Sequence, residues 1–235
     1  MTGAQAMVLA AGRGERMRPL TDSCPKPLLD VRGKPLLQHH IEALARGGLR
    51  DIVINSAWLG QQIEDRFPPD FQGLRIRHST EGKDFGGALE TAGGIARALP
   101  LLADCFWLAA GDVYAPQFEL SRAALERFDA GGRLAHIFLV PNPTHNPKGD
   151  FGLRADGTVL RDGSPRSTYS TIGMYRKAFF ASLPAGNPQG LKAAMLPLLL
   201  AAIDQAQLTA EVYTGLWIDV GTPQRLQALN DDAPL

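Results

Sequence analysis

Short runs of apolar residues alternate with longer segments in the first half of the chain, and the longer segments have a helical spacing. Runs of apolar or alternating character occupy residues 6–10, 51–55, 74–78 and 105–110. Between them, apolar residues recur every three or four positions over residues 36–47, 60–66 and 89–98. The runs predict strands and the periodic segments predict helices. Their regular alternation predicts an α/β protein with a Rossmann-like open sheet, mixed but mainly parallel, covered by helices on both faces.

The second half of the chain has a less regular pattern. We expect strands at 134–140, 151–153, 170–175 and 211–220, and helices at 191–205 and 223–230. Residues 141–149 form a loop rich in proline and asparagine. Because no low-complexity linker separates the halves, we expect one domain over residues 3–231, with an inserted portion that faces the substrate.

Composition and charge exclude several classes of function. The 235 residues include 24 basic and 24 acidic ones, and this balance argues against a nucleic acid or another polyanion as partner. The longest apolar run, 195–203, is interrupted by Pro197 and is shorter than the roughly 20 residues of a membrane span. No secretory signal begins the sequence, so we expect a cytoplasmic protein. Cys24 and Cys105 have no zinc-ligand spacing. The oligomeric state stays open.

A glycine-rich and basic loop follows the first predicted strand. Gly12 and Gly14 allow close approach of backbone N–H groups to anionic oxygens, and Arg13, Arg16 and Lys26 supply positive charge. The loop lacks the Gly-Lys-Ser/Thr ending of a P-loop and the third glycine of a dinucleotide-binding turn. A lone Gly-x-Gly is equally typical of a tight turn, but the extended pattern favours a triphosphate site.

Residues 9–21, with Leu-Ala-Ala-Gly-x-Gly-x-Arg-x-x-Pro-Leu-Thr, and Pro-Lys-Pro-Leu at 25–28 resemble the signature of the sugar-1-phosphate nucleotidyltransferases. This resemblance implies the nucleotide-diphospho-sugar transferase fold. Its nucleotide-binding part would cover about 3–115, and its sugar-binding part would cover about 116–231. It also implies a reaction in which a sugar phosphate attacks the α-phosphorus of a nucleoside triphosphate and pyrophosphate leaves.

Two aspartates follow predicted strands and are candidates for a Mg²⁺ site. Mg²⁺ is usually held by one or two carboxylates together with phosphate oxygens and waters. Asp112 ends the run Phe-Trp-Leu-Ala-Ala-Gly-Asp, and Asp219 lies in Trp-Ile-Asp-Val-Gly-Thr. A single aspartate at a strand end is more often a turn or cap residue. In the resembling family, however, Gly-Asp and Asp-x-Gly-Thr segments supply the metal-binding pair.

Basic residues of the loop complete the expected catalytic set. Lys26 is flanked by prolines that keep its backbone extended, so we expect it to contact phosphate. Arg16 is its expected companion at the β- and γ-phosphates, with Arg13 contributing as the loop closes. The expected catalytic residues are Arg16, Lys26, Asp112 and Asp219.

Recognition of the base and of the sugar involves other segments. The backbone at 9–12 resembles the family segment that contacts the base. Glu81 would accept the N3–H of uracil, or it is an exposed loop acid. Leu-Glu-Thr-Ala-Gly-Gly at 89–94 resembles the family's Leu-Glu-Thr-Gly-Gly-Gly, which implies that Glu90 and Thr91 hold nucleotide and sugar. The expected nucleotide-binding set is Leu9, Ala10, Ala11, Gly12, Arg13, Gly14, Glu81 and Gly111.

Three further segments, at 54–65, 142–151 and 217–222, resemble the N-acetylmuramate-1-phosphate uridylyltransferases of cell-wall recycling. The resemblance implies UTP and N-acetylmuramate 1-phosphate as substrates and UDP-N-acetylmuramate and pyrophosphate as products. The lactyl carboxylate of that sugar needs a basic or amide partner, for which Lys192 and Asn142 are candidates. Asp150 faces the sugar or simply begins a strand.

Other readings remain open. A mannose- or glucose-1-phosphate nucleotidylyltransferase that uses GTP, dTTP or UTP would share the same catalytic residues. A non-catalytic module that only binds nucleotide would not need Lys26 and both aspartates. The five histidines show no catalytic spacing, and we interpret them as surface or packing residues. Trp58 is interpreted as a packing residue at the end of a strand.

Overall fold

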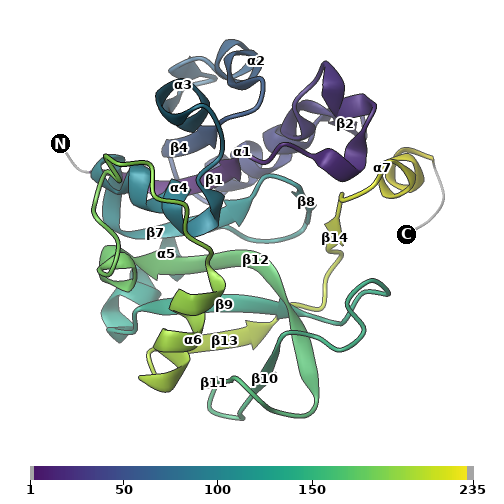
Figure 1. Ribbon diagram of the computed structural model, residues 1–235. Helices are drawn as coiled ribbons and strands as arrows, with labels where there is room; N and C mark the ends of the chain where they lie inside the picture. Colours follow the sequence, from purple (N-terminus) through teal and green to yellow (C-terminus); the bar gives the residue numbers. More distant parts are fainter. Residues whose placement is uncertain (1–2, 232–235) are drawn as a thin grey trace.

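A ten-stranded sheet runs through the computed structural model, which describes residues 3–231 (Figure 1). The central strand β1 (Ala4–Ala10) pairs in parallel with β4 on one side and with β7 on the other. Apolar residues fill most of β1 because both of its faces are covered. Beyond it lie β4 (Asp51–Ser56), β6 (Leu74–Thr80) and the short β5 (Asp70–Phe71) towards one edge, and β7 (Leu102–Ala110) on the other side.

Beyond β7 the sheet becomes partly antiparallel. The long strand β12 (Arg166–Arg176) runs antiparallel to both β7 and β9 (Ala135–Val140), and β13 (Leu208–Val212) pairs in parallel with β9. A small hairpin of β10 (Phe151–Leu153) and β11 (Val159–Leu160) pairs with the start of β12. One sheet therefore connects the two halves of the chain.

Helices cover both faces of the sheet, as the strand and helix pattern predicts. Successive residues of a strand point to opposite faces, so Val8 joins one apolar cluster and Met7 the other. The Val8 cluster includes side chains of α1 (Leu36–Arg46), α2 (Gly60–Arg66) and α5 (Arg122–Gly131). The Met7 cluster includes side chains of α4 (Glu90–Ala98) and α6 (Leu196–Asp204). The expected fold class is confirmed.

The C-terminal segment returns from the second half of the chain to the first (Figure 1). Strand β14 (Ile218–Asp219) pairs antiparallel with β8 (Val113–Tyr114), which directly follows Asp112. Helix α7 (Pro223–Asn230) then lies beside β2 (Asp30–Val31), where the side chain of Asn230 bonds to the backbone of Asp30 at 2.9 Å. This return brings Asp219 next to the strand that follows Asp112.

Short elements complete the described residues. Strand β3 (Lys34–Pro35) pairs with β2, and α3 (Glu81–Phe85) follows β6. The 3-10 helices are Glu15–Met17, Leu20–Asp22, Lys26–Leu28, Leu99–Leu101 and Lys177–Phe180. Among residues 3–231, no helix has both the length and the apolar character needed to cross a bilayer.

Several element predictions are wrong in detail. The expected strand 211–220 is two separate strands, β13 and β14, since the chain leaves one sheet and enters another between them. The expected helix 191–205 begins only at Leu196, with Pro197 in its first turn. Proline is tolerated there because backbone N–H groups of the first turn have no partner within the helix. Helix α5, which the apolar pattern did not reveal, begins at a cap in which Ser121 Oγ accepts the Ala124 N–H at 3.2 Å.

Candidate active site

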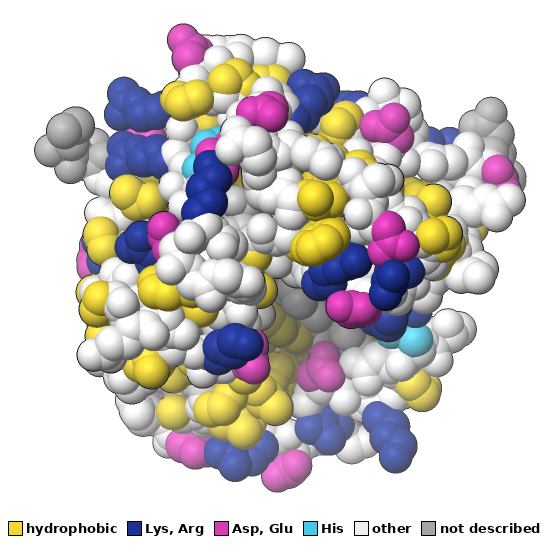
Figure 2. Space-filling view, turned by 45° about the horizontal axis from the view of Figure 1, so that its top comes forward, with side chains coloured by type: hydrophobic (Ala, Val, Ile, Leu, Met, Phe, Trp, Pro, Cys, Tyr) yellow, Lys and Arg dark blue, Asp and Glu magenta, His cyan; other side chains and the backbone are white. Residues whose placement is uncertain are grey.

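A cavity of about 790 Å³ lies at the carboxyl ends of the central strands. Figure 2 shows the surface hollowed in this way, with hydrophobic, basic and acidic side chains around the hollow. Ligands of open α/β sheets bind at this position. Nine of the expected site residues line the cavity: Leu9, Ala10, Ala11, Gly12, Lys26, Glu90, Thr91, Asp112 and Asp150.

Hydrogen bonds between neighbouring strand ends fix the floor of the cavity. The Ala10 N–H donates to Asn55 Oδ1 at 2.8 Å, and the Gly111 N–H donates to the Leu9 carbonyl at 2.8 Å. A methyl group on Gly111 would come within 2.7 Å of that carbonyl. Gly111 is therefore needed for close contact between two backbones, and it does not line the cavity.

The loop after β1 is closed by a left-handed turn at Gly14. Its φ of 69° suits glycine, and its carbonyl accepts a hydrogen bond from Thr21 Oγ1 at 2.9 Å. Gly14 shapes the turn and does not line the cavity, whereas Ala11 and Gly12 do. The turn leads the chain on to Lys26, which begins a 3-10 helix and is not extended as the flanking prolines suggested.

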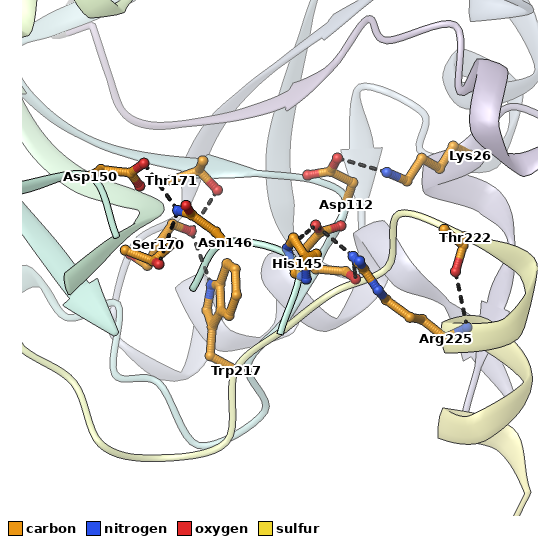
Figure 3. Close-up of polar contacts among 12 residues, drawn as sticks. Lys26, Asp112, His145, Asn146, Asp150, Ser170, Thr171, Trp217, Thr222 and Arg225 are labelled. Carbon is orange, nitrogen blue, oxygen red and sulfur yellow. Dashed lines mark hydrogen bonds and ion pairs between the residues drawn. The ribbon is translucent and has the colours of Figure 1, made fainter. Parts of the chain in front are cut away.

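Lys26 and Asp112 meet at the cavity wall (Figure 3). Lys26 Nζ lies 2.7 Å from Asp112 Oδ2, although the residues are far apart in the chain. The lysine side chain is only 9% exposed, while the aspartate side chain is 44% exposed. A buried ammonium group next to an accessible carboxylate gives the site a fixed positive charge and an accessible oxygen donor. The structure thus brings two expected catalytic residues into direct contact.

Asp219 lies one ladder position from Asp112. It pairs with Val113 across the β14–β8 ladder, and the Val220 N–H donates to the Asp112 carbonyl at 2.9 Å. Asp219 does not line the large cavity itself. Its side chain is 20% exposed, so it faces a more enclosed environment than Asp112.

Two residues that the sequence did not single out hold the Asp219 carboxylate. Arg225 Nη1 donates to Asp219 Oδ2 at 2.8 Å, and His145 Nε2 lies 3.1 Å from the same oxygen. This contact corrects the interpretation of His145 as an ordinary surface or packing residue. The spacing of histidines and acids in the sequence does not reveal the contact with Asp219, because His145 lies in the loop before β10. The one available signal was its position in the motif at 142–151.

The divalent-cation site expected at Asp112 and Asp219 stays a prediction, and one carboxylate oxygen bears on it. Asp219 Oδ1 is buried and has no hydrogen-bond partner among the described residues. A buried carboxylate oxygen in that condition is costly unless a further group binds it. Among residues 3–231, no cluster of three or more His, Cys, Asp or Glu side chains has the geometry of a metal site. A pair of carboxylates is nevertheless what a magnesium-type ion commonly uses when phosphate oxygens supply further ligands.

Arg16 and Arg13 do not line the cavity. Arg16 is exposed and lies near the second aspartate: a methyl group on Gly221 would be 3.3 Å from Arg16 Nη2 and 2.6 Å from Asp219 Oδ1. Arg13 stacks on Trp58 with 3.8 Å between its guanidinium carbon and the ring centroid, and it donates to the Thr21 carbonyl at 2.9 Å. Arg13 thus braces the loop, and the packing role of Trp58 is confirmed.

Glu81 supports the cavity wall from behind and corrects both readings of this residue. It is fully buried, so it is not an exposed loop acid, and it does not line the cavity. Its Oε1 accepts from Asn55 Nδ2 at 2.6 Å and its Oε2 accepts from the Leu89 N–H at 2.8 Å. Burial raises the pKa of this carboxyl group. Gly94 makes room for it, since a methyl group there would lie 2.4 Å from Oε1.

The opposite wall of the cavity comes from α4, β10 and β12. Glu90, with a φ of 61°, and Thr91 begin α4 and are exposed beside the cavity. The Asp150 carboxylate accepts from Asn146 Nδ2 at 3.0 Å and from the Tyr169 N–H at 2.8 Å, which ties the loop before β10 to β12 (Figure 3). Asp150 thus has a structural role and also lines the cavity.

Neither of the two residues expected to meet a carboxylate on the sugar lines the cavity. Lys192 is exposed and does not line the cavity. Asn142 does not line it either, because its amide is engaged by the Arg166 carbonyl at 3.0 Å and by Thr168 Oγ1 at 2.9 Å. Arg161 and Arg166 do line the cavity. Sequence spacing did not reveal them, since Arg161 follows β11, Arg166 begins β12, and neither lies in a motif.

Comparison with known proteins agrees with this geometry. The profile of the family described as "Nucleotidyl transferase" matches residues 5–234. N-acetylmuramate alpha-1-phosphate uridylyltransferase of Neisseria meningitidis is 45% identical over 95% of both chains. The protein of the same name from Caulobacter vibrioides is 32% identical over 93% of this chain and 92% of its own.

A solved structure confirms the fold. The putative glucose-1-phosphate thymidylyltransferase of Bacillus anthracis superposes with a TM-score of 0.75 over 98% of this chain and 96% of its own, at 21% identity. With the match to the family profile and to two full-length relatives, these findings settle the family. The chain belongs to the nucleotidyl transferase family.

Proposed function

We propose that this protein transfers a uridylyl group from UTP to N-acetylmuramate 1-phosphate and releases UDP-N-acetylmuramate and pyrophosphate. The observation that carries the proposal is the 45% identity, over 95% of both chains, with a relative named for this reaction. The contact between Lys26 and Asp112 in the cavity supports nucleotidyl transfer in general, because a cation and a metal-binding carboxylate are the groups that such a transfer uses.

Nucleotidyl transfer brings two anionic groups together, so alignment and neutralisation of charge dominate its catalysis. Lys26 would bind phosphate oxygens of the nucleotide, and the backbone at Ala11 and Gly12 would approach them closely. Asp112 and Asp219 would hold Mg²⁺, which would supply further neutralisation of the phosphate charge when bound. Arg225 and His145 orient the Asp219 carboxylate. The attacking oxygen belongs to the sugar phosphate, so no nucleophilic side chain is required.

The proposed substrates also suggest where the reaction takes place. N-acetylmuramate is a sugar of peptidoglycan, so the product would return this sugar to cell-wall synthesis. UTP is a cytoplasmic nucleotide, and we place the reaction in the cytoplasm. The partners proposed for the protein are these small molecules, with no nucleic acid or membrane.

A crossed substrate panel tests the proposal. Purified protein with Mg²⁺ is given each of UTP, GTP, dTTP and CTP with N-acetylmuramate, glucose or mannose 1-phosphate, and pyrophosphate release is measured. We expect the highest kcat/KM for UTP with N-acetylmuramate 1-phosphate. The mannose-1-phosphate guanylyltransferase subunit of Xenopus tropicalis is 36% identical over 94% of this chain, though over only 62% of its own length. A preference for GTP and mannose 1-phosphate would therefore overturn the proposal in favour of a mannose-1-phosphate guanylyltransferase.

A second arm of the panel addresses a non-catalytic reading. A module that only senses nucleotide would bind UTP, as measured by calorimetry, without releasing pyrophosphate in any pairing. Tight UTP binding together with no turnover across the panel would refute enzymatic function.

A further inference from the structure

We infer that Arg161 and Arg166 form a subsite that binds a carboxylate on the sugar phosphate and thereby selects an acidic sugar. The inference rests on the proposed function and deepens it. Three cationic side chains line the cavity: Lys26, Arg161 and Arg166. Lys26 lies against Asp112 and belongs to the phosphate end. The two arginines come from another segment, between β11 and the start of β12.

Arg166 is held in place by backbone carbonyls. Its Nη2 donates to the Asp150 carbonyl at 2.6 Å and to the Arg161 carbonyl at 2.9 Å. Its Nε is buried and has no hydrogen-bond partner among the described residues. A guanidinium group fixed in this way, with donor capacity left over, is suited to a planar acceptor such as a carboxylate.

Arg161 is the more accessible of the two. Its side chain is 46% exposed, and it donates to the carboxylate of Asp204 at 2.7 Å, whose side chain is itself 61% exposed. An exposed ion pair of this kind contributes little to stability, so exchanging Asp204 for a ligand carboxylate costs little. Arg161 can therefore turn towards a ligand without disturbing the core.

Apolar side chains of α6 and of the residue before it complete the subsite. Met195, Leu196, Leu199 and Leu200 line the same cavity, and Leu196 is 54% exposed. A cation beside an apolar wall matches a substituent that carries both a carboxylate and a methyl group. The lactyl ether of N-acetylmuramate has both, whereas a neutral hexose phosphate has neither. The chemistry of this wall therefore favours an acidic, methyl-bearing sugar.

Substitution of Arg161 tests the inference with a matched pair of sugars. With UTP held constant, kcat/KM is measured for N-acetylmuramate 1-phosphate and for N-acetylglucosamine 1-phosphate, which lacks only the lactyl group. In R161Q we expect kcat/KM for the acidic sugar to fall at least about tenfold, the size of one lost hydrogen bond to a charged group. The value for the neutral sugar should change less than about threefold, because a surface substitution alone costs little.

The control variant is R154Q. Arg154 is exposed in the same β10–β11 hairpin region and does not line the cavity, so its loss should leave both values unchanged. Replacement R166K, which keeps the charge but not the planar guanidinium, should also lower the preference for the acidic sugar.

The outcomes separate the two proposals. A wild-type protein that does not use the acidic sugar refutes the proposed function. A wild-type preference for the acidic sugar that survives unchanged in R161Q overturns the subsite alone. A parallel rise of the KM for UTP with both sugars also overturns it, because the arginine would then serve the triphosphate.

Discussion

The two ends of the cavity are built in different ways. The phosphate end, which contains Lys26 and Asp112, lies at the ends of the central strands. Lys26 is buried there, and hydrogen bonds join the ends of β1, β4 and β7, the one to β4 through the side chain of Asn55. The sugar end consists of a hairpin, the start of β12 and α6, with exposed side chains such as Arg161 and Leu196. On the proposed function, chemistry shared by all substrates would lie on the central strands, and selection of the substrate would fall to peripheral segments that can vary.

The largest effect is expected at the phosphate end. In D112N or D219N, kcat should fall about 10²–10³-fold because each variant removes a carboxylate that would hold the metal in the proposed reaction. The loss should be equal for acidic and neutral sugars, since neither aspartate belongs to the sugar end. Pyrophosphate release measures kcat, and circular dichroism checks that the fold is kept.

The matched control is D70N, since Asp70 is an exposed acid on β5 at the far edge of the sheet. It should retain wild-type kcat. Full activity in D112N or D219N would remove that residue from the metal site.

Glu81 provides the next prediction, because it supports the phosphate end without contacting the cavity. In E81Q, an NH₂ group replaces one of the two carboxylate oxygens that accept hydrogen bonds, so two donors face each other in a buried position. The free energy of unfolding should therefore fall by about 1–3 kcal/mol. Selectivity for UTP over other triphosphates should not change. Urea unfolding and the nucleotide panel measure the two effects, with E126Q on the exposed face of α5 as control. A loss of UTP selectivity without a loss of stability would return Glu81 to the base-binding set.

His145 connects the two ends of the cavity, since it lies in the loop before β10 but contacts Asp219. In H145Q, kcat should fall about tenfold because one of two groups orienting a carboxylate is lost. KM for the sugar and the melting temperature should stay close to wild type. T144A, at an exposed neighbour in the same loop, serves as the control. An increase of the sugar KM instead of a fall in kcat would assign His145 to sugar binding.

The smallest effect at neutral pH concerns His40, which lies behind the phosphate end. Its Nε2 donates to the Val113 carbonyl at 2.7 Å, and complete burial lowers the pKa of His40 from 6.5 to about 4. Between pH 6.5 and about 4, His40 therefore binds a proton in the unfolded chain but stays neutral in the folded protein. As the pH falls from about 6.5 to about 4, the free energy of unfolding should decrease by up to roughly 3 kcal/mol.

The variant H40Q isolates this contribution. Glutamine can keep the hydrogen bond to Val113 but does not titrate, so the part of the pH dependence due to His40 should vanish. Urea unfolding at a series of pH values measures the difference between wild type and variant. An identical pH profile in both proteins would contradict the assignment.

The sequence located several residues that line the cavity at the ends of the central strands, because the signals for them are local. Strand 6–10, the glycine loop and Lys26 are close in the chain, and Asp112 directly ends an apolar strand. The period of the apolar residues located α1, α2 and α4 to within a residue or two for the same reason. The division of the chain at about residue 115 into nucleotide-binding and sugar-binding parts stays a prediction.

The sugar end was less predictable because its contacts join distant, irregular segments. Arg161 and Arg166 follow no periodic pattern, and the contact of His145 with Asp219 depends on the return of β14 to β8. Glu81 misled the reading from sequence because a loop-like Glu-Gly pair turned out to be the buried start of α3. Burial of a charged residue between two donors cannot be read from a single sequence.

The separation of catalysis from selection is tested most directly by one ratio, measured in two variants. The ratio is kcat/KM for N-acetylmuramate 1-phosphate divided by that for N-acetylglucosamine 1-phosphate, with UTP. In K26M we expect kcat to fall about 10²-fold for both sugars, so that the ratio stays at its wild-type value. In R161Q we expect turnover of the neutral sugar to persist while the ratio collapses. A ratio that changes equally in both variants would contradict the separation of catalysis from selection, because both ends of the cavity would then contribute to the choice of sugar.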